Sequence, residues 1–74
     1  MPRFHFHARG PNRSIPNPVG YELADLSAAR EVAVEIIRDM ARNPFHRGDY
    51  RHWAMHIKNE EGRTMVTIPF VIAM

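Results

Sequence analysis

Residues 25–44 read DLSAAREVAVEIIRDMARNP and contain the one segment of the chain with a convincing helical pattern. Apolar side chains recur there at spacings of three and one, which is the period of a single helix face. Asp25 is a good N-cap, with Ser27 as a second candidate, and Asn43 before Pro44 ends the segment. We therefore predict a helix over about 26–42, with an apolar stripe of Leu26, Ala29, Val32, Ala33, Ile36, Ile37 and Met40.

The opening stretch PRFHFHAR has the two-residue period of a half-buried strand over residues 3–8. Its apolar side consists of Phe4, Phe6 and Ala8, and its polar side of Arg3, His5, His7 and Arg9. The segment GPN at 10–12 favours a turn. Residues 13–15 are then predicted to pair back as a short second strand. Pro16 and Pro18 stop it, because proline cannot donate a ladder hydrogen bond.

The C-terminal part of the chain alternates twice more. Residues 50–58 place Trp53, Met55 and Ile57 on one side, and Tyr50, His52, Ala54, His56 and Lys58 on the other. The segment NEEG is a turn in which Gly62 can take a left-handed conformation, so residues 63–72 are predicted to return as the partner strand of a hairpin. Val66, Ile68, Phe70 and Ile72 then join the Trp53 side, and Pro69 indicates a sheet edge or a bulge.

The order strand, short strand, helix, strand, strand predicts an α+β fold: a small antiparallel sheet in ββαββ order, with one amphipathic helix packed on one face. A chain of 74 residues allows one domain, covering 1–74, of marginal stability. The absence of cysteine excludes a disulfide framework, a thiol nucleophile and cysteine-based zinc sites. No stretch has the length of a signal peptide or a membrane span, so we expect a cytoplasmic protein without membrane partners.

The sheet face opposite the helix is the most informative surface of this fold. The assigned alternation collects basic residues there and no acidic residue: Arg3, His5, His7, Arg9, His52, His56, Lys58 and Arg63. The formal net charge of +2 would rise to +7 if all five histidines were protonated. The charge of the protein surface as a whole should therefore respond to pH near about 6.5.

Three functions compete for this face. The first is a non-catalytic interaction module that self-associates as a homodimer, or that binds another protein, through the face or a sheet edge. The second is nucleic-acid binding through the His/Arg-rich face, although the aromatic side chains point inward. The third is transition-metal binding, for which His5, His7, His52 and His56 are weak candidates without a visible third ligand at fixed spacing.

Enzyme chemistry finds no support in the sequence. The chain has no glycine-rich phosphate loop and no Ser-His-Asp arrangement that spacing supports. We predict no catalytic residues and no cofactor, and we take the candidate interaction face as His5, His7, His52, His56, Arg3, Arg9 and Lys58.

Motifs along nearly the whole chain resemble a family of short bacterial proteins of unknown function. They are the opening Met-Pro-Arg with its aromatic strand, the segment GYELADLSAAR before the helix, and the TIPF-like last strand. The turn RGPNR stands where members of that family usually carry an acidic residue and a glycine. The resemblance implies a fold and no activity. Among the matching positions, Glu22 and Arg30 have no evident packing role, and we expect a salt bridge between them near the helix start.

Overall fold

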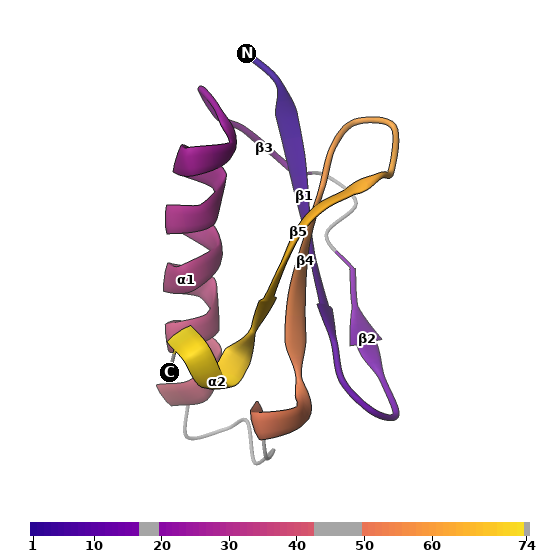
Figure 1. The fold of residues 1–74 in the computed structure, drawn as a ribbon, viewed down its shortest axis with the longest axis vertical. Helices are drawn as coiled ribbons and strands as arrows, with labels where there is room; N and C mark the ends of the chain where they lie inside the picture. The colour runs from indigo at the N-terminus through magenta and orange to yellow at the C-terminus, as the bar shows by residue number, and fades with distance from the viewer. Residues whose placement is uncertain (17–19, 43–49, 74) are drawn as a thin grey trace.

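The computed structural model describes residues 1–16, 20–42 and 50–73. An antiparallel sheet forms one layer, and a long helix covers one of its faces, with a short C-terminal helix beside it (Figure 1). The elements in chain order are β1 (Arg3–Arg9), β2 (Ser14–Ile15), β3 (Tyr21–Glu22), α1 (Leu26–Arg42), the 3-10 helix η1 (Tyr50–His52), β4 (Ala54–Lys58), β5 (Thr64–Pro69) and α2 (Phe70–Ala73). This arrangement confirms the predicted α+β class.

Helix α1 has the predicted bounds and the predicted start. The Ala28 N–H donates to Asp25 Oδ1 at 2.9 Å, which is the bond expected of an N-cap carboxylate. The apolar stripe faces the sheet: Ala29, Ala33 and Ile37 are buried, and the charged side chains lie outside it. The predicted stop at Asn43–Pro44 lies outside the described residues.

The sheet has the strand order β2-β1-β4-β5, and β3 pairs with the other half of β1. Every pairing is antiparallel. The predicted hairpins are both present, with Gly62 at φ +82° in the turn between β4 and β5. Pro69 ends β5 at the outer edge of the described sheet, where its missing N–H removes no bond to a neighbouring strand.

Strand β3 was not predicted, and it changes the edge beside β1. Its residues pair as Arg3 with Glu22 and Phe4 with Tyr21, and the Leu23 N–H donates to the Pro2 carbonyl at 3.0 Å. Strand β2 covers only the last two residues of β1, so the first half of β1 is left to accept a second short partner. Pro16 follows β2 directly, as predicted, but the pairing of this edge resumes at β3; Pro18 lies outside the described residues.

The predicted strand over 50–58 is wrong in its first part. Strand β4 begins at Ala54, and Tyr50 to His52 form a 3-10 turn closed by the Trp53 N–H donating to the Tyr50 carbonyl at 3.0 Å. Tyr50 is buried against Phe70, with ring centroids 5.6 Å apart. It therefore belongs to the core and not to the opposite face, because burial of its ring outweighs continuation of the strand.

The last predicted strand is also shorter than expected. It ends at Pro69, after which Phe70–Ala73 turn into α2. The Phe70 ring is fully buried, as the alternation predicts, but Ile72 is 75% exposed and does not join the core. The helical turn is responsible, because it points Ile72 away from the side on which a continuing strand would have placed it.

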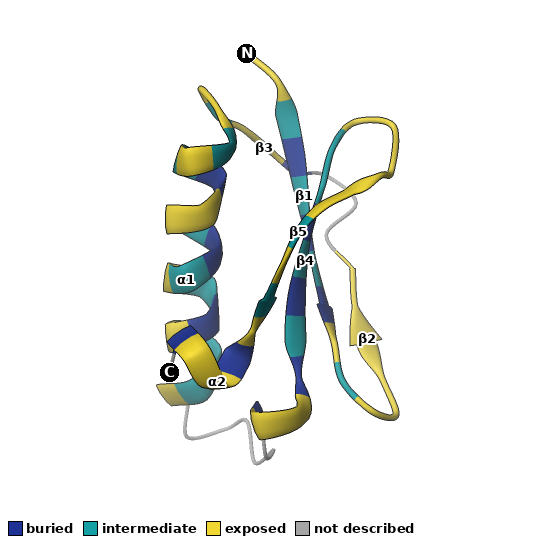
Figure 2. Cartoon of the chain, viewed as in Figure 1, coloured by how far each residue is buried: buried dark blue, intermediate teal, exposed yellow. Residues whose placement is uncertain are grey.

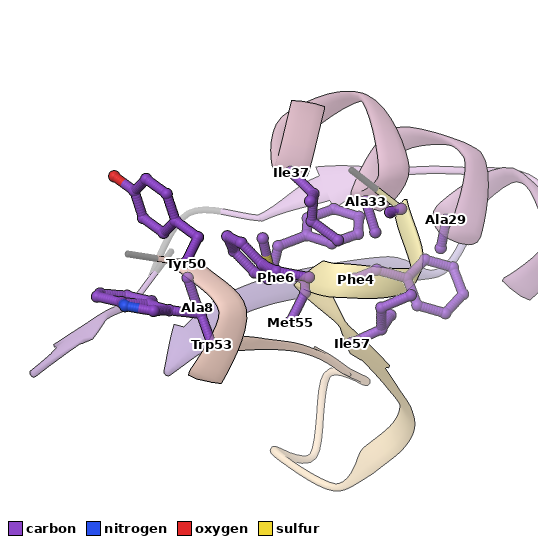
Figure 3. Packing of buried hydrophobic residues seen from close by; sticks show 12 residues of the cluster. Phe4, Phe6, Ala8, Ala29, Ala33, Ile37, Tyr50, Trp53, Met55 and Ile57 are labelled. Carbon is purple, nitrogen blue, oxygen red and sulfur yellow. The ribbon is translucent and has the colours of Figure 1, made fainter. Parts of the chain in front are cut away.

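The core lies between α1 and the sheet (Figure 3), and Figure 2 shows buried residues along the facing sides of both layers. Aromatic rings close its lower end, where Trp53 contacts both Tyr50 and Phe70 with centroids 5.4 and 6.1 Å apart. The buried residues are Phe4, Phe6, Ala8, Ala29, Ala33, Ile37, Tyr50, Trp53, Met55, Ile57, Phe70 and Ala73. The other sheet face carries the candidate site.

Candidate interaction face

The sheet face that α1 does not cover, here called the open face, is organised into rows that run across the strands. Cα pairing places His7 opposite His56, and His56 opposite Thr67. We call these three residues the central row. On one side of it lies the row His5, Lys58 and Thr64, and on the other the row Arg9, Ala54 and Pro69.

The three side chains of the central row contact one another in sequence across the strands. The His7 and His56 rings meet edge to face, with centroids 6.4 Å apart and an interplanar angle of 86°. His56 Nδ1 lies 3.0 Å from Thr67 Oγ1, so the hydroxyl fixes the orientation of this ring. His7 Nε2 is buried and has no hydrogen-bond partner in the part of the chain that the structure describes. Alternation with the core residues Val66 and Ile68 puts Thr67 on this face, but a local pattern does not contain its contact with His56.

Partial burial, the largest cause, lowers the pKa of His7, and the positive charges of Lys58, His56 and Arg9 lower it further. Burial likewise lowers the pKa of His56, with additional repulsion from Lys58 and Arg9. Both imidazoles are therefore held toward the neutral form, mainly by burial and further by the positive charges around them.

The Arg3 end of the open face differs from the prediction of a face without acidic residues. Arg3 Nη2 forms an ion pair with Glu22 Oε1 at 3.0 Å, because β3 brings Glu22 opposite Arg3. The Arg3 N–H also donates to Glu60 Oε1 at 3.1 Å. The predicted Glu22–Arg30 salt bridge is therefore wrong, since Glu22 pairs with Arg3. Because Glu22 neutralises Arg3, the net positive charge of the face comes mainly from Lys58 and Arg9.

Two other predicted residues lie away from the rows. His52 is exposed in η1, before β4 begins, so it does not join His56 on the sheet. Arg63 is exposed in the turn between β4 and β5, where its N–H donates to Asn59 Oδ1 at 2.9 Å. The rows thus bring together His5, His7, Arg9, His56 and Lys58 from the predicted basic set.

The metal hypothesis has little geometric support. Within the described ranges, no three histidine, cysteine, aspartate or glutamate side chains come together as a metal-binding group. His7 and His56 meet edge to face, and one nitrogen of His56 faces Thr67.

Among the residues that the structure describes, no helix has the length and apolar character needed to span a bilayer.

The lowered pKa values predict that acidification destabilises the fold. The unfolded chain, with imidazole pKa values of about 6.5, binds protons at a higher pH than folded His7 and His56 do. Their contribution to the free energy of unfolding is present above about pH 6.5 and is lost as the pH falls through the folded-state values. Urea unfolding monitored by Trp53 fluorescence between about pH 7.5 and 5.5 measures this slope.

The matched variants for this prediction are His7→Gln/His56→Gln and His52→Gln. The double variant should flatten the pH dependence more than His52→Gln, which removes one imidazole from outside the central row. A wild-type free energy of unfolding that rises on acidification, or a double variant with the wild-type slope, would contradict the assigned environment of the two rings.

Comparison with known families finds a match to a model described as a domain of unknown function, DUF6894, over residues 3–71. The chain belongs to the DUF6894 family. The match includes every strand of the DUF6894 sheet and all of α1, so the open face lies entirely within it. The predicted membership in an uncharacterised family is thereby confirmed. Searches of curated proteins and of solved structures return no match.

Proposed function

We propose that this domain is a non-catalytic interaction module that binds an acidic polypeptide segment on the open face of its sheet. The observation that carries the proposal is the composition of the three rows. They contribute Arg9, Lys58 and three histidines, and none of their residues is acidic. Opposite charges across a protein interface favour encounter and fix orientation, so a surface of this composition favours an anionic partner.

The electrostatics of the histidines support the same partner. Lys58 and Arg9 each lower the pKa values of both His7 and His56, so all four groups share one positive environment. A carboxylate placed among them offsets this repulsion and favours the protonated imidazoles. Binding is therefore coupled to proton uptake, and affinity for an acidic segment increases as the pH falls toward 6.

The spacing of the rows suits an extended chain. Side chains two residues apart on a strand are separated by about 7 Å, which is the separation between His5, His7 and Arg9 along β1. A bound segment in extended conformation has alternate side chains at the same spacing. Carboxylates at alternate positions of the ligand thus match successive rows, while imidazole and threonine groups provide hydrogen-bond partners.

Nucleic acid is the less favoured ligand because the face offers no platform for bases. Stacking on exposed aromatic rings contributes about 1–3 kcal/mol per base in proteins that bind single strands. Here Phe4 and Phe6 point into the core, and Trp53 and Phe70 are buried at its end. The described residues of the three rows include histidine but no phenylalanine, tyrosine or tryptophan.

Fluorescence anisotropy with labelled ligands tests the proposal. The probe is a peptide with glutamate at alternate positions, compared with its glutamine counterpart and with oligothymidylate, at low and moderate salt. We expect salt-dependent binding of the glutamate peptide, because exposed ion pairs are screened. We expect Arg9→Gln/Lys58→Gln to weaken it about tenfold, the effect of losing two such pairs.

The control removes equal charge elsewhere. Arg30→Gln/Arg42→Gln alters exposed residues of α1, on the other side of the molecule from the open face, and should leave affinity near the wild-type value. Equal binding of the glutamate and glutamine peptides would refute the proposal. Tighter binding of oligothymidylate than of the glutamate peptide would also refute the proposal and indicate nucleic acid as the ligand.

A further inference from the structure

Strand β5 forms an edge of the sheet whose outer side has no partner strand in the described part of the chain. The Phe70 N–H donates to the Trp53 carbonyl at 2.9 Å, and the pairing continues through Ile68 with Met55 and Val66 with Ile57. Because bonded and non-bonded positions alternate in an antiparallel pair, the backbone groups of Thr67 point away from β4. They are directed at the outer edge.

The composition of this edge is unusual for a chain in which 24% of residues are charged. No charged residue occurs over 64–73, which spans all of β5 and α2. Exposed edges are commonly protected by charges, prolines or bulges; β5 has no charge, and its proline and bulge do not reach its middle. Pro69 and the bulge opposite Ile57/Lys58 lie toward the two ends of the strand and leave Val66, Thr67 and Ile68 between them.

We infer that β5 pairs with β5 of a second copy of the chain, antiparallel about a two-fold axis at Thr67. This register sets Thr67 opposite its equivalent and Val66 opposite Ile68 of the other copy. Val66 and Ile68 already pack against the core and are half-buried, so the pairing extends that core across the junction. Pro69, which lacks an N–H, falls opposite Met65, next to the bulge where the ladder is already irregular.

Exposed apolar side chains adjoin this edge. Met65, Val71 and Ile72 are 46%, 57% and 75% exposed, and all three belong to β5 or α2. A second copy is the occupant that the charge pattern favours: two uncharged edges meet without repulsion, whereas stacking two open faces would oppose Lys58 and Arg9 to the same residues. Edge pairing instead joins the two central rows into one continuous surface. The inference does not depend on what that surface binds.

Sedimentation equilibrium over a range of concentrations tests the association. We expect the average mass to rise from 8.6 kDa toward twice that value. Thr67→Pro removes the outward N–H and should raise the dissociation constant about tenfold or more, since two symmetry-related bonds are lost. Thr67→Val removes the same hydroxyl but keeps the N–H, and should dimerise nearly as well as the wild type. A mass of 8.6 kDa at every concentration would overturn the inference.

A second measurement tests the register, and it also tests the pairing itself if Thr67→Pro does not fold. The chain has no cysteine, so Thr67→Cys introduces a single thiol at the proposed axis. Directly opposed residues of a bonded antiparallel pair have Cα atoms about 5.5 Å apart, within the range that a disulfide bridges. Mild oxidation should give a covalent dimer of Thr67→Cys and none of Ser14→Cys, which lies on the opposite edge. Equal yields from the two variants, or no dimer from Thr67→Cys, would refute the pairing.

Discussion

Replacing Phe70 with alanine is expected to lower the free energy of unfolding by about 3–5 kcal/mol, the usual cost of removing a buried aromatic ring. The Phe70 side chain is 0% exposed and contacts both Tyr50 and Trp53. Its backbone N–H, which alanine retains, donates to the Trp53 carbonyl just before β4, so the expected loss comes from the ring. A chain of 74 residues has a total stability of about 4–11 kcal/mol, so this single change removes a large part of it and unfolds the chain if the total lies near the lower bound.

Urea titration followed by Trp53 fluorescence and circular dichroism measures the effect. Ile72→Ala is the matched control, because it removes a similar apolar group from the same short helix at a 75% exposed position. At the lowest protein concentration that fluorescence allows, this control should stay within about 0.5 kcal/mol of the wild type. Similar losses in the two variants would mean that Phe70 does not join η1 to the core as described.

Gly20→Ala is expected to destabilise the fold by about 2–4 kcal/mol. Gly20 has a φ of +75°, which costs an L-residue about 1–2 kcal/mol. A Cβ atom at this position would also lie 2.7 Å from the Phe4 carbonyl oxygen and 2.9 Å from the His5 ring. Because the oxygen belongs to the backbone of β1, relief of this contact requires movement of the strand itself.

Gly62→Ala separates the two causes. Gly62 has a similar φ of +82°, but a Cβ atom there meets no described atom within 4 Å. It should cost only the conformational part, about 1–2 kcal/mol. The difference between the two variants, measured by urea titration, then reports the contact with β1. Equal losses would show that the chain before β3 does not pack against Phe4 and His5.

The fold could be predicted where long elements separate core from solvent. Seven residues of β1 and seventeen of α1 repeat their burial often enough for the period to be recognised. Strand β3 has two residues and no period, and a backbone bond between Leu23 and Pro2 marks its pairing. Alternation places Tyr50 on the face opposite Trp53. In the structure its ring stacks on Phe70 and is buried, and this long-range contact is not contained in the local pattern.

The sequence predicted on which face of the sheet the candidate residues lie, but not which of them lie next to each other. Alternation assigned His7 and His56 to one face, and register then made them direct partners. Register depends on the whole sheet, so the sequence did not distinguish His56 from His52 as the neighbour of His7. The acidic residue beside Arg3 was missed because β3 was not predicted, and the pairing of β3 with β1 is what brings Glu22 opposite Arg3.

A ¹⁵N-resolved NMR titration of the full chain with the alternating glutamate peptide at about pH 6 tests most directly whether the open face is the binding surface. We expect the largest shift changes on the amides of His7, His56, Lys58 and Thr67, with little change along α1. We also expect weaker binding in the same titration at about pH 8, because neutral imidazoles no longer contribute charge. Shift changes centred on α1, or none at a large excess of peptide, would contradict the assignment of the open face as the binding surface.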